Sequence, residues 1–230
     1  MNKISIIIPI LNEAEIIENL LIYILKNTSK DNVSEIIIVD GGSTDGSQSI
    51  VSKFSNSILL NSKKGRAKQM NLGAKHATGN ILYFLHADSF PPKNFDQFIV
   101  DEVKKNNQAG CFRMQFNSTH WWLKLVCWFT QFNHPACRGG DQSQFITKRL
   151  FEDIGGFNES YVIYEDNILI QALYERKQFV VINKKLKTSA RLYQKHGVWK
   201  LQYHFARIYF KRWIGASAEE LHIYYLKHIA

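Results

Sequence analysis

The stretch "EIIIVDGGSTDGS", residues 35–47, runs from a block of apolar residues straight into an acid and a glycine-rich turn. A second stretch, "ILYFLHADSF", residues 81–90, also carries an apolar run into an acid, and two prolines follow it. Continuous apolar runs bounded by Gly or Pro are typical of strands buried on both faces, as in a parallel sheet. Ligands of open α/β sheets bind beyond the carboxyl ends of such strands. Asp40 and Asp88 are therefore candidate ligand-binding residues, and capping of the following helix or turn is the alternative.

The segments around these two runs alternate between strand and helix patterns. We expect strands at 4–10, 35–40, 57–60 and 80–86 and helices at 13–26, 44–54 and 66–77. Such alternation predicts βαβ units and a mostly parallel sheet flanked by helices, so the fold class is α/β. Further along the chain we expect helices at 94–106, 119–132, 148–154 and 165–176 and strands at 110–116 and 143–148.

The composition indicates a globular protein in a reducing compartment. The hydrophobic content of 45% is ordinary for a globular core. The chain contains 3 cysteines without metal-ligand or C-x-x-C spacing, and it starts without a signal-peptide pattern, so we expect a cytoplasmic protein. The most apolar stretch, 121–132, contains a lysine and is shorter than the ~20 residues that span a bilayer.

The positive charge of the chain is concentrated near its C-terminus. Residues 1–175 contain 17 Lys and Arg against 18 Asp and Glu, whereas residues 176–230 contain 12 against 2. The excess alternates with aromatic residues in "VWKLQYHFARIYFKRWIG", residues 198–215, a pattern that indicates a membrane surface or another polyanion. The alternative is a helix that packs on the core through its aromatic side. Although the sequence contains no clear linker, we expect a domain at 1–190 and a basic, aromatic helical extension at 191–230, packed on that domain or on a membrane surface.

Two common nucleotide-binding fingerprints are absent from the sequence. The turn "DGGSTDG" lacks G-x-G-x-x-G spacing, and no G-x-x-x-x-G-K-[ST] motif occurs. What remains is a first strand ending in "PILNE", a second ending in "VDGGSTDGS", a basic segment "KKGRAKQMNLGAKHATGN" and a fourth strand ending in "HADS". In this combination the sequence, over residues 3–190, resembles the family 2 glycosyltransferases, which are inverting enzymes of the Rossmann-like GT-A nucleotide-sugar fold.

The resemblance implies substrate-binding residues at the ends of the predicted strands. Residues expected to recognise the nucleotide are Pro9, Leu11, Asn12, Glu13, Asp40 and Gly41. Residues expected near the diphosphate, the sugar or the acceptor are Lys64, Arg66, Asn71, His86, Ala87, Gly140, Gln142 and Arg191. This agrees with their chemistry, because carboxylates accept hydrogen bonds from base or ribose groups and guanidinium groups bind phosphates.

The resemblance also implies a divalent cation, Mg²⁺ or Mn²⁺. In the family, the fourth strand ends in a D-x-D-like motif whose last carboxylate binds a metal that bridges the two phosphates. Here the motif is "HAD", so Asp88 is retained and His86 replaces the first acid. His86 then binds the sugar, touches the metal or packs. His196 is a further candidate metal ligand, with a packed or surface histidine as the alternative.

The catalytic residues are expected in "YVIYEDNILIQAL", residues 161–173. The resemblance assigns Asp166 as the general base and Glu165 as its orienting neighbour, and the predicted helix N-terminus favours ionised carboxylates. Asp141 is the second candidate base, and a turn-capping role is its alternative. Direct displacement at the anomeric carbon needs one base and a cation to stabilise the leaving diphosphate.

These observations lead to a predicted function with two rivals. The prediction is a metal-dependent inverting glycosyltransferase that uses a nucleotide diphosphate sugar, with UDP as first choice, and an acceptor hydroxyl. The aromatic helix at 119–132 either lines a groove for a lipid-linked acceptor or belongs to the core. The rivals are a nucleotidyltransferase of related fold and a non-catalytic protein that binds polyanions or membrane surfaces. No nucleic acid partner is expected.

Overall fold

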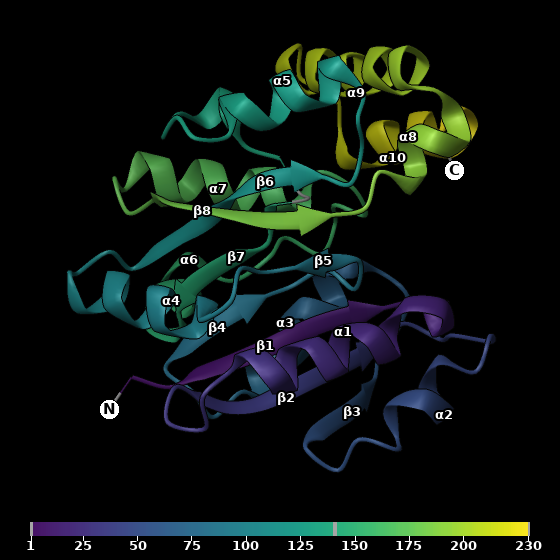
Figure 1. The fold of residues 1–230 in the computed structure, drawn as a ribbon. Coiled ribbons are helices and arrows are strands. Elements are labelled where there is room, and N and C mark those ends of the chain that lie inside the picture. The colour runs from purple at the N-terminus through teal and green to yellow at the C-terminus, as the bar shows by residue number, and fades with distance from the viewer. Residues whose placement is uncertain (1, 140–141, 230) are drawn as a thin grey trace.

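A computed structural model of the protein describes residues 2–139 and 142–229, and Figure 1 shows its sheet between layers of helices. The strands are β1 (Ile4–Ile10), β2 (Val33–Asp40), β3 (Ser57–Asn61), β4 (Ile81–Phe84), β5 (Ser89–Phe90), β6 (Ala109–Phe116), β7 (Gln144–Thr147) and β8 (Val180–Thr188). They form an 8-stranded sheet in the order β3-β2-β1-β4-β7-β6-β8-β5. The strands β3, β2, β1 and β4 are parallel to one another, and β6 is parallel to β8. The strand β7 is antiparallel to its neighbours β4 and β6, and β5 is antiparallel to β8. The predicted α/β class with a mostly parallel sheet is confirmed.

Helices cover both faces of the sheet and form a third layer at one end (Figure 1). One face packs against α1 (Ala14–Asn27), α2 (Ser47–Val51) and α4 (Phe95–Lys104). The other face packs against α3 (Arg66–His76), α6 (Lys148–Ile154) and α7 (Glu165–Glu175). The third layer contains α5 (Trp121–Phe129), α8 (Arg191–His196), α9 (Val198–Trp213) and α10 (Ala218–His228). A short 3₁₀ turn at Pro135–Cys137 precedes β7.

The central strands are fixed by their apolar residues. Every residue of β1 is buried, and so are the last five of β2. Each fully buried isoleucine contributes about 1.5–3 kcal/mol relative to an exposed one, which strongly favours this register. Ile10 of β1 pairs with Asp40 of β2, and Asp40 pairs with Asn61 of β3, so three strands end side by side. This alignment places their polar end residues at one edge of the sheet.

Several elements differ from the sequence prediction. The strand predicted at 80–86 ends at Phe84, and the helix predicted at 44–54 extends only over Ser47–Val51. Strands β5 and β8 were not predicted. Most residues in the middle of β8 are exposed, including three lysines, so it lacks the apolar run that identifies a buried strand. The strand β5 is two residues long and exists through its pairing with β8.

The helices after residue 190 pack against the rest of the chain. Leu201, Ile208 and Leu221 share one apolar cluster with Phe116 of β6 and Leu123 of α5. The domain boundary at residue 190 stays a prediction. Among the residues that the structure describes, no helix combines the length and the apolar character needed to cross a bilayer.

Gly110 offers a test of the pairing between β6 and β8. An alanine Cβ at this position would lie 2.3 Å from the carbonyl oxygen of Val180, a backbone atom that cannot rotate away. We expect Gly110→Ala to lower the free energy of unfolding by about 1–3 kcal/mol because the strands must separate. Lys75→Ala on the exposed side of α3 is the control, with an expected change within about 0.5 kcal/mol. Equal urea midpoints for the two variants would contradict the observed β6–β8 contact.

Candidate active site

The loops that follow β1 and β2 are connected by hydrogen bonds. Asn12 adopts a left-handed conformation with φ 57°, and its N–H donates to Ser43 Oγ at 2.9 Å. Its side-chain oxygen accepts from the N–H of Thr44 at 2.9 Å, and the N–H of Glu13 donates to Ser47 Oγ at 2.9 Å. These bonds fix the two loops relative to each other before any ligand binds.

Asp40 organises the glycine-rich turn after β2. Its buried carboxylate accepts from the N–H of Gly42 at 3.0 Å, from the N–H and hydroxyl of Ser43, and from Gln48 Nε2 at 2.6 Å. Burial by itself would raise the pKa of Asp40, but the bonds from Ser43, Gln48 and Gly42 together outweigh it and hold the pKa below its usual value. The carboxylate therefore stabilises the turn in its ionised form.

Gln69 of α3 forms hydrogen bonds to the ends of both β1 and β2. Its Nε2 donates to the carbonyl oxygens of Ile10 and Val39, each at 2.8 Å, inside the protein. A side chain at Gly41 would lie 3.0 Å from Gln69 Oε1, so the close approach of the turn favours glycine. Of the other two residues expected to contact the base, Pro9 is buried within β1 and Leu11 is half-buried just after it.

Arg191 connects the start of α8 to the ends of β1 and β4. Its guanidinium donates to both Glu13 oxygens, at 2.8 and 2.6 Å, and its Nε lies 3.6 Å from Asp88 Oδ2. The pKa of Arg191 is raised above its usual value, mainly by the hydrogen bonds to Glu13. The structure thus brings together three predicted site residues, two of which are carboxylates.

The oxygen donors at this position suit a hard divalent cation. Glu13 and Asp88 both face the guanidinium of Arg191, and Mg²⁺ or Mn²⁺ prefers carboxylate oxygens. Within residues 2–139 and 142–229, no group of three or more His, Cys, Asp or Glu side chains could hold a metal. Diphosphate oxygens or water would therefore have to complete the coordination of an ion here.

Glu165 and Asp166 begin α7 and lie beside Arg66 of α3. Arg66 Nη1 lies 3.3 Å from Glu165 Oε1 and 3.7 Å from Asp166 Oδ2. The two acids are only 1% and 7% exposed, so the positive charge of Arg66 offsets the cost of burying them. Tyr164, just before them, has φ 71°, a conformation that non-glycine residues adopt mainly where the surroundings enforce it.

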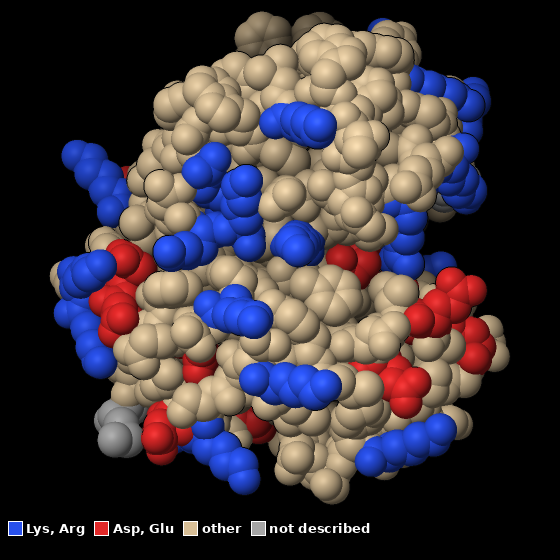
Figure 2. Space-filling view, in the orientation of Figure 1, with Lys and Arg blue, Asp and Glu red and all other residues tan. Residues whose placement is uncertain are grey.

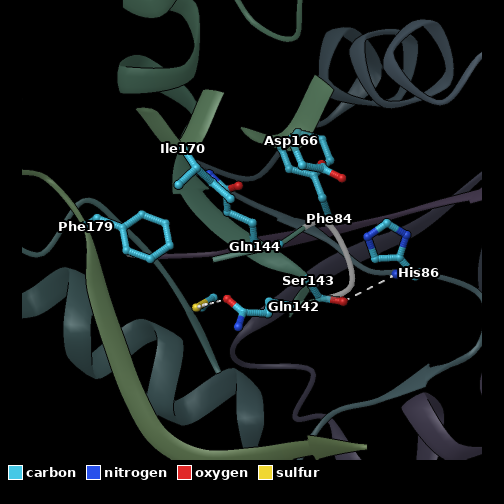
Figure 3. Close-up of a pocket in the computed structure, with 10 residues that line it drawn as sticks. Phe84, His86, Gln142, Ser143, Gln144, Asp166, Ile170 and Phe179 are labelled. Atoms are coloured by element: carbon cyan, nitrogen blue, oxygen red, sulfur yellow. Dashed lines mark hydrogen bonds between the residues drawn. The ribbon is translucent and has the colours of Figure 1, made fainter. Parts of the chain in front are cut away.

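A pocket between β4, β7 and α7 contains three of the predicted residues (Figure 3). Asp166 reaches it from α7, His86 from the segment after β4, and Gln142 from the segment before β7. Its lining residues are Phe84, His86, Cys111, Gly139, Gln142, Ser143, Gln144, Asp166, Ile170 and Phe179. The predicted base and the end of the fourth strand therefore border one cavity.

Gln144 and Ser143 also line this pocket and were not predicted. Gln144 is 6% exposed, and within the described part of the chain neither its Nε2 nor its Oε1 has a hydrogen-bond partner. Buried amides are nearly always satisfied, so this one is suited to bind a polar ligand. Ser143 has φ 45°, and its Oγ lies 3.5 Å from the N–H of His86. The sequence signal that could have identified these two residues is their polar character at the start of a buried strand.

Arg138, another residue that was not predicted, positions Gln142. It is 4% exposed and donates to Gln142 Oε1 at 3.0 Å and to the carbonyl oxygens of Thr130 and Phe132 at 2.7 and 2.6 Å. Its Nη1 also lies 3.1 Å from the sulfur of Cys111, whose pKa burial raises to about 11. Arg138 thus orders the segment that leads to the pocket. The predicted residues Gly140 and Asp141 lie outside the described residues.

The remaining predicted residues are distributed around the site. Asn71 donates to the carbonyl oxygen of Phe157 and accepts from its N–H, both at 2.9 Å, so its amide is used to hold the turn at 155–159. Lys64 is exposed and Ala87 is buried in the core. His196 ends α8, and its Nε2 is buried without a hydrogen-bond partner among the described residues. Their roles toward a ligand stay predictions.

The C-terminal helices reach the start of α7, which the sequence did not indicate. The hydroxyl of Tyr209 on α9 donates to Asn167 Oδ1 at 3.2 Å, and its ring lies 5.1 Å from that of Tyr164. The C-terminal extension therefore contacts the start of α7, where the predicted catalytic acids lie.

Comparison with known proteins identifies related sequences. The family described as "Glycosyl transferase family 2" matches residues 5–157. The glycosyltransferase AglE of Haloferax volcanii is 33% identical over 94 residues, which cover 38% of this chain and 31% of the relative. The undecaprenyl-phosphate 4-deoxy-4-formamido-L-arabinose transferase of Sodalis glossinidius is 29% identical over 131 residues, which cover 49% of this chain and 40% of the relative. The matched segment thus spans less than half the length of these curated relatives.

Solved structures with a similar fold include two in complex with nucleotides. Residues 1–349 of TarS from S. aureus, in complex with UDP, superpose with a TM-score of 0.68 at 19% identity, covering 82% of this chain and 60% of that chain. The mannosyltransferase PcManGT from Pyrobaculum calidifontis, in complex with GDP-Man and Mn²⁺, has a TM-score of 0.68 at 20% identity and covers 97% of this chain and 69% of that chain. At these identities the likeness shows the fold.

The turn after β2 yields a stability prediction. Asp40→Asn removes one acceptor oxygen and the negative charge, so we expect a loss of about 1–3 kcal/mol in unfolding free energy at pH 7. Because the folded-state pKa of Asp40 is lowered, its stabilisation is present above the unfolded-state pKa and disappears as pH falls through the folded value. The difference between wild type and variant in thermal melts should therefore shrink below about pH 4. A difference independent of pH would contradict this role for the carboxylate.

Proposed function

The chain belongs to glycosyl transferase family 2, and we propose that it transfers a sugar from a nucleotide diphosphate sugar to an acceptor by direct displacement with inversion. The family match covers residues 5–157, and the fold is GT-A. One observation carries the proposal: Asp166 and His86 line the same pocket, so the candidate base lies next to the end of the fourth strand.

The nucleotide is proposed to bind over the connected loops after β1 and β2. Asp40 already accepts hydrogen bonds from its own turn, so we assign base and ribose recognition mainly to Leu11, Asn12 and Glu13 and to the backbone around Gly41. UDP is our first candidate, because the structure of TarS that this chain resembles contains UDP. GDP is the second, because the similar mannosyltransferase contains GDP-Man.

Asp166 is proposed as the general base. It would accept the proton of the acceptor hydroxyl while that oxygen attacks the anomeric carbon and the nucleotide diphosphate departs. Arg66 lies next to both acids of α7 and places a positive charge 3.7 Å from Asp166 Oδ2. Gln144, whose amide faces the pocket, is placed to bind a hydroxyl of the sugar or of the acceptor.

A divalent cation is proposed at Asp88, with Glu13 as a neighbouring oxygen donor. When bound, it would act as a Lewis acid that stabilises the leaving diphosphate. Arg191 places a positive charge beside these carboxylates. On binding of the donor we expect Arg191 to turn from them toward the diphosphate, where its guanidinium can form paired hydrogen bonds. Lys64, which is exposed two residues before α3, would add positive charge near the diphosphate.

The acceptor is proposed to be linked to a lipid, with the protein at the cytoplasmic face of a membrane. Support comes from the relatives that are named undecaprenyl-phosphate transferases and from the C-terminal extension. Helix α9 contacts α7 through the hydrogen bond from Tyr209 to Asn167. Helix α9 also exposes large apolar residues beside its lysines and arginines. Those more than half exposed on α9 or directly after it are Trp199, Tyr203, Phe210, Trp213 and Ile214.

The base and the metal site can be separated by mutation. We expect Asp166→Asn to slow transfer by about 10²–10⁴-fold while nucleotide binding is retained. Asp88→Ala should instead weaken the metal-dependent part of nucleotide binding. The measurement is release of UDP or GDP from their sugars in the presence of a lipid extract, together with calorimetric nucleotide binding.

Glu175→Gln provides a matched control, because Glu175 is an exposed acid at the other end of α7. It should keep both turnover and binding. Wild-type turnover in Asp166→Asn would move the base role to another residue, with Asp141 the next to test.

A further inference from the structure

A second cavity lies beside the C-terminal half of β6 and shares no lining residue with the pocket in Figure 3. It is a groove of about 310 Å³ between α5 and the strands β6 and β8. We name it the α5 groove. Its lining residues are Arg113, Met114, Gln115, Phe116, Ser118, Leu123, Lys124, Cys127, Trp128 and Lys185.

The α5 groove carries positive charge from three different elements. Arg113 comes from β6, Lys124 from α5 and Lys185 from β8, and its described lining includes no Asp or Glu. Figure 2 shows Lys and Arg side chains gathered over β6 and β8, between α5 and α4. Arg113 Nη1 donates to Asn183 at 2.6 Å, while its buried Nε has no hydrogen-bond partner within the described chain. Such a donor is suited to an anionic acceptor.

The remaining walls of the α5 groove are apolar and open onto exposed aromatic rings. Met114, Phe116 and Leu123 form the buried part. Trp128, at the rim, is 50% exposed and lies 5.2 and 5.0 Å from the rings of Phe129 and Phe132, which are also exposed. Aromatic residues that are exposed beside cations are typical of surfaces that insert into the headgroup region of a bilayer.

We propose that the α5 groove binds the phosphate headgroup of an anionic membrane lipid and so docks the protein on the bilayer. The three cations match the phosphate, and the apolar wall with its aromatic rim matches the start of the acyl chains. A free phosphate would leave the apolar wall unused, so the observations favour the lipid. This site lies outside the transfer reaction, and it holds whether or not the proposed donor chemistry is correct.

The test is co-sedimentation of the full chain with vesicles of phosphatidylcholine, with and without phosphatidylglycerol. We expect binding only to the anionic vesicles. The double substitution Lys124→Gln, Lys185→Gln should lower the partition coefficient by about fivefold for each removed charge. Trp128→Ala should lower it further, whereas the same variants should keep their melting temperatures because all three side chains are exposed.

The control is a second double variant that also loses two positive charges but leaves the α5 groove unchanged. Lys53→Gln, Lys75→Gln changes two exposed lysines, one in the turn after α2 and one on α3, and should keep the partition coefficient within about twofold. All variants retain the C-terminal extension, so a selective loss locates binding in the groove. Equal loss in both double variants, or binding that is insensitive to phosphatidylglycerol, would overturn the proposal.

Discussion

The hydrogen bonds at the carboxyl ends of β1 and β2 are the constraint on which the site depends. The apolar residues of these strands bring their ends together deep in the protein, where polar groups must find partners. Gln69 satisfies two carbonyl oxygens there, and Asp40 satisfies the donors of the following turn. The two buried strands therefore end on a hydrogen-bonded polar surface, where we propose that the nucleotide binds.

Two arginines connect this surface to the rest of the site. Arg66, at the start of α3, lies beside the acids of α7, and Arg191, at the start of α8, lies beside Glu13 and Asp88. Each therefore compensates carboxylates that come from distant parts of the sequence. The structure thereby places a guanidinium beside the candidate base and another beside the candidate metal ligands.

The sequence predicted those parts of the fold that local patterns determine. The apolar runs identified β1, β2 and β4, and the acids and glycines after them indicated the candidate site. Strand β8 was missed because its exposed lysines interrupt the apolar pattern, and the roles of Gln144, Arg138 and Tyr209 were missed because each depends on tertiary contacts. The pairing of Arg191 with Glu13 was also hidden, since 178 positions separate them in the sequence.

The most direct test of the account is thermal unfolding with UDP, GDP, CDP or ADP, each with Mn²⁺ and with a chelator. A ligand present at about 100 times its dissociation constant adds about 2.7 kcal/mol to stability, which is measurable as a higher midpoint. We predict that one nucleotide raises the midpoint in a metal-dependent manner and that Asp88→Ala abolishes the metal dependence. Unchanged midpoints with all four nucleotides would contradict a nucleotide-sugar site at the ends of β1, β2 and β4.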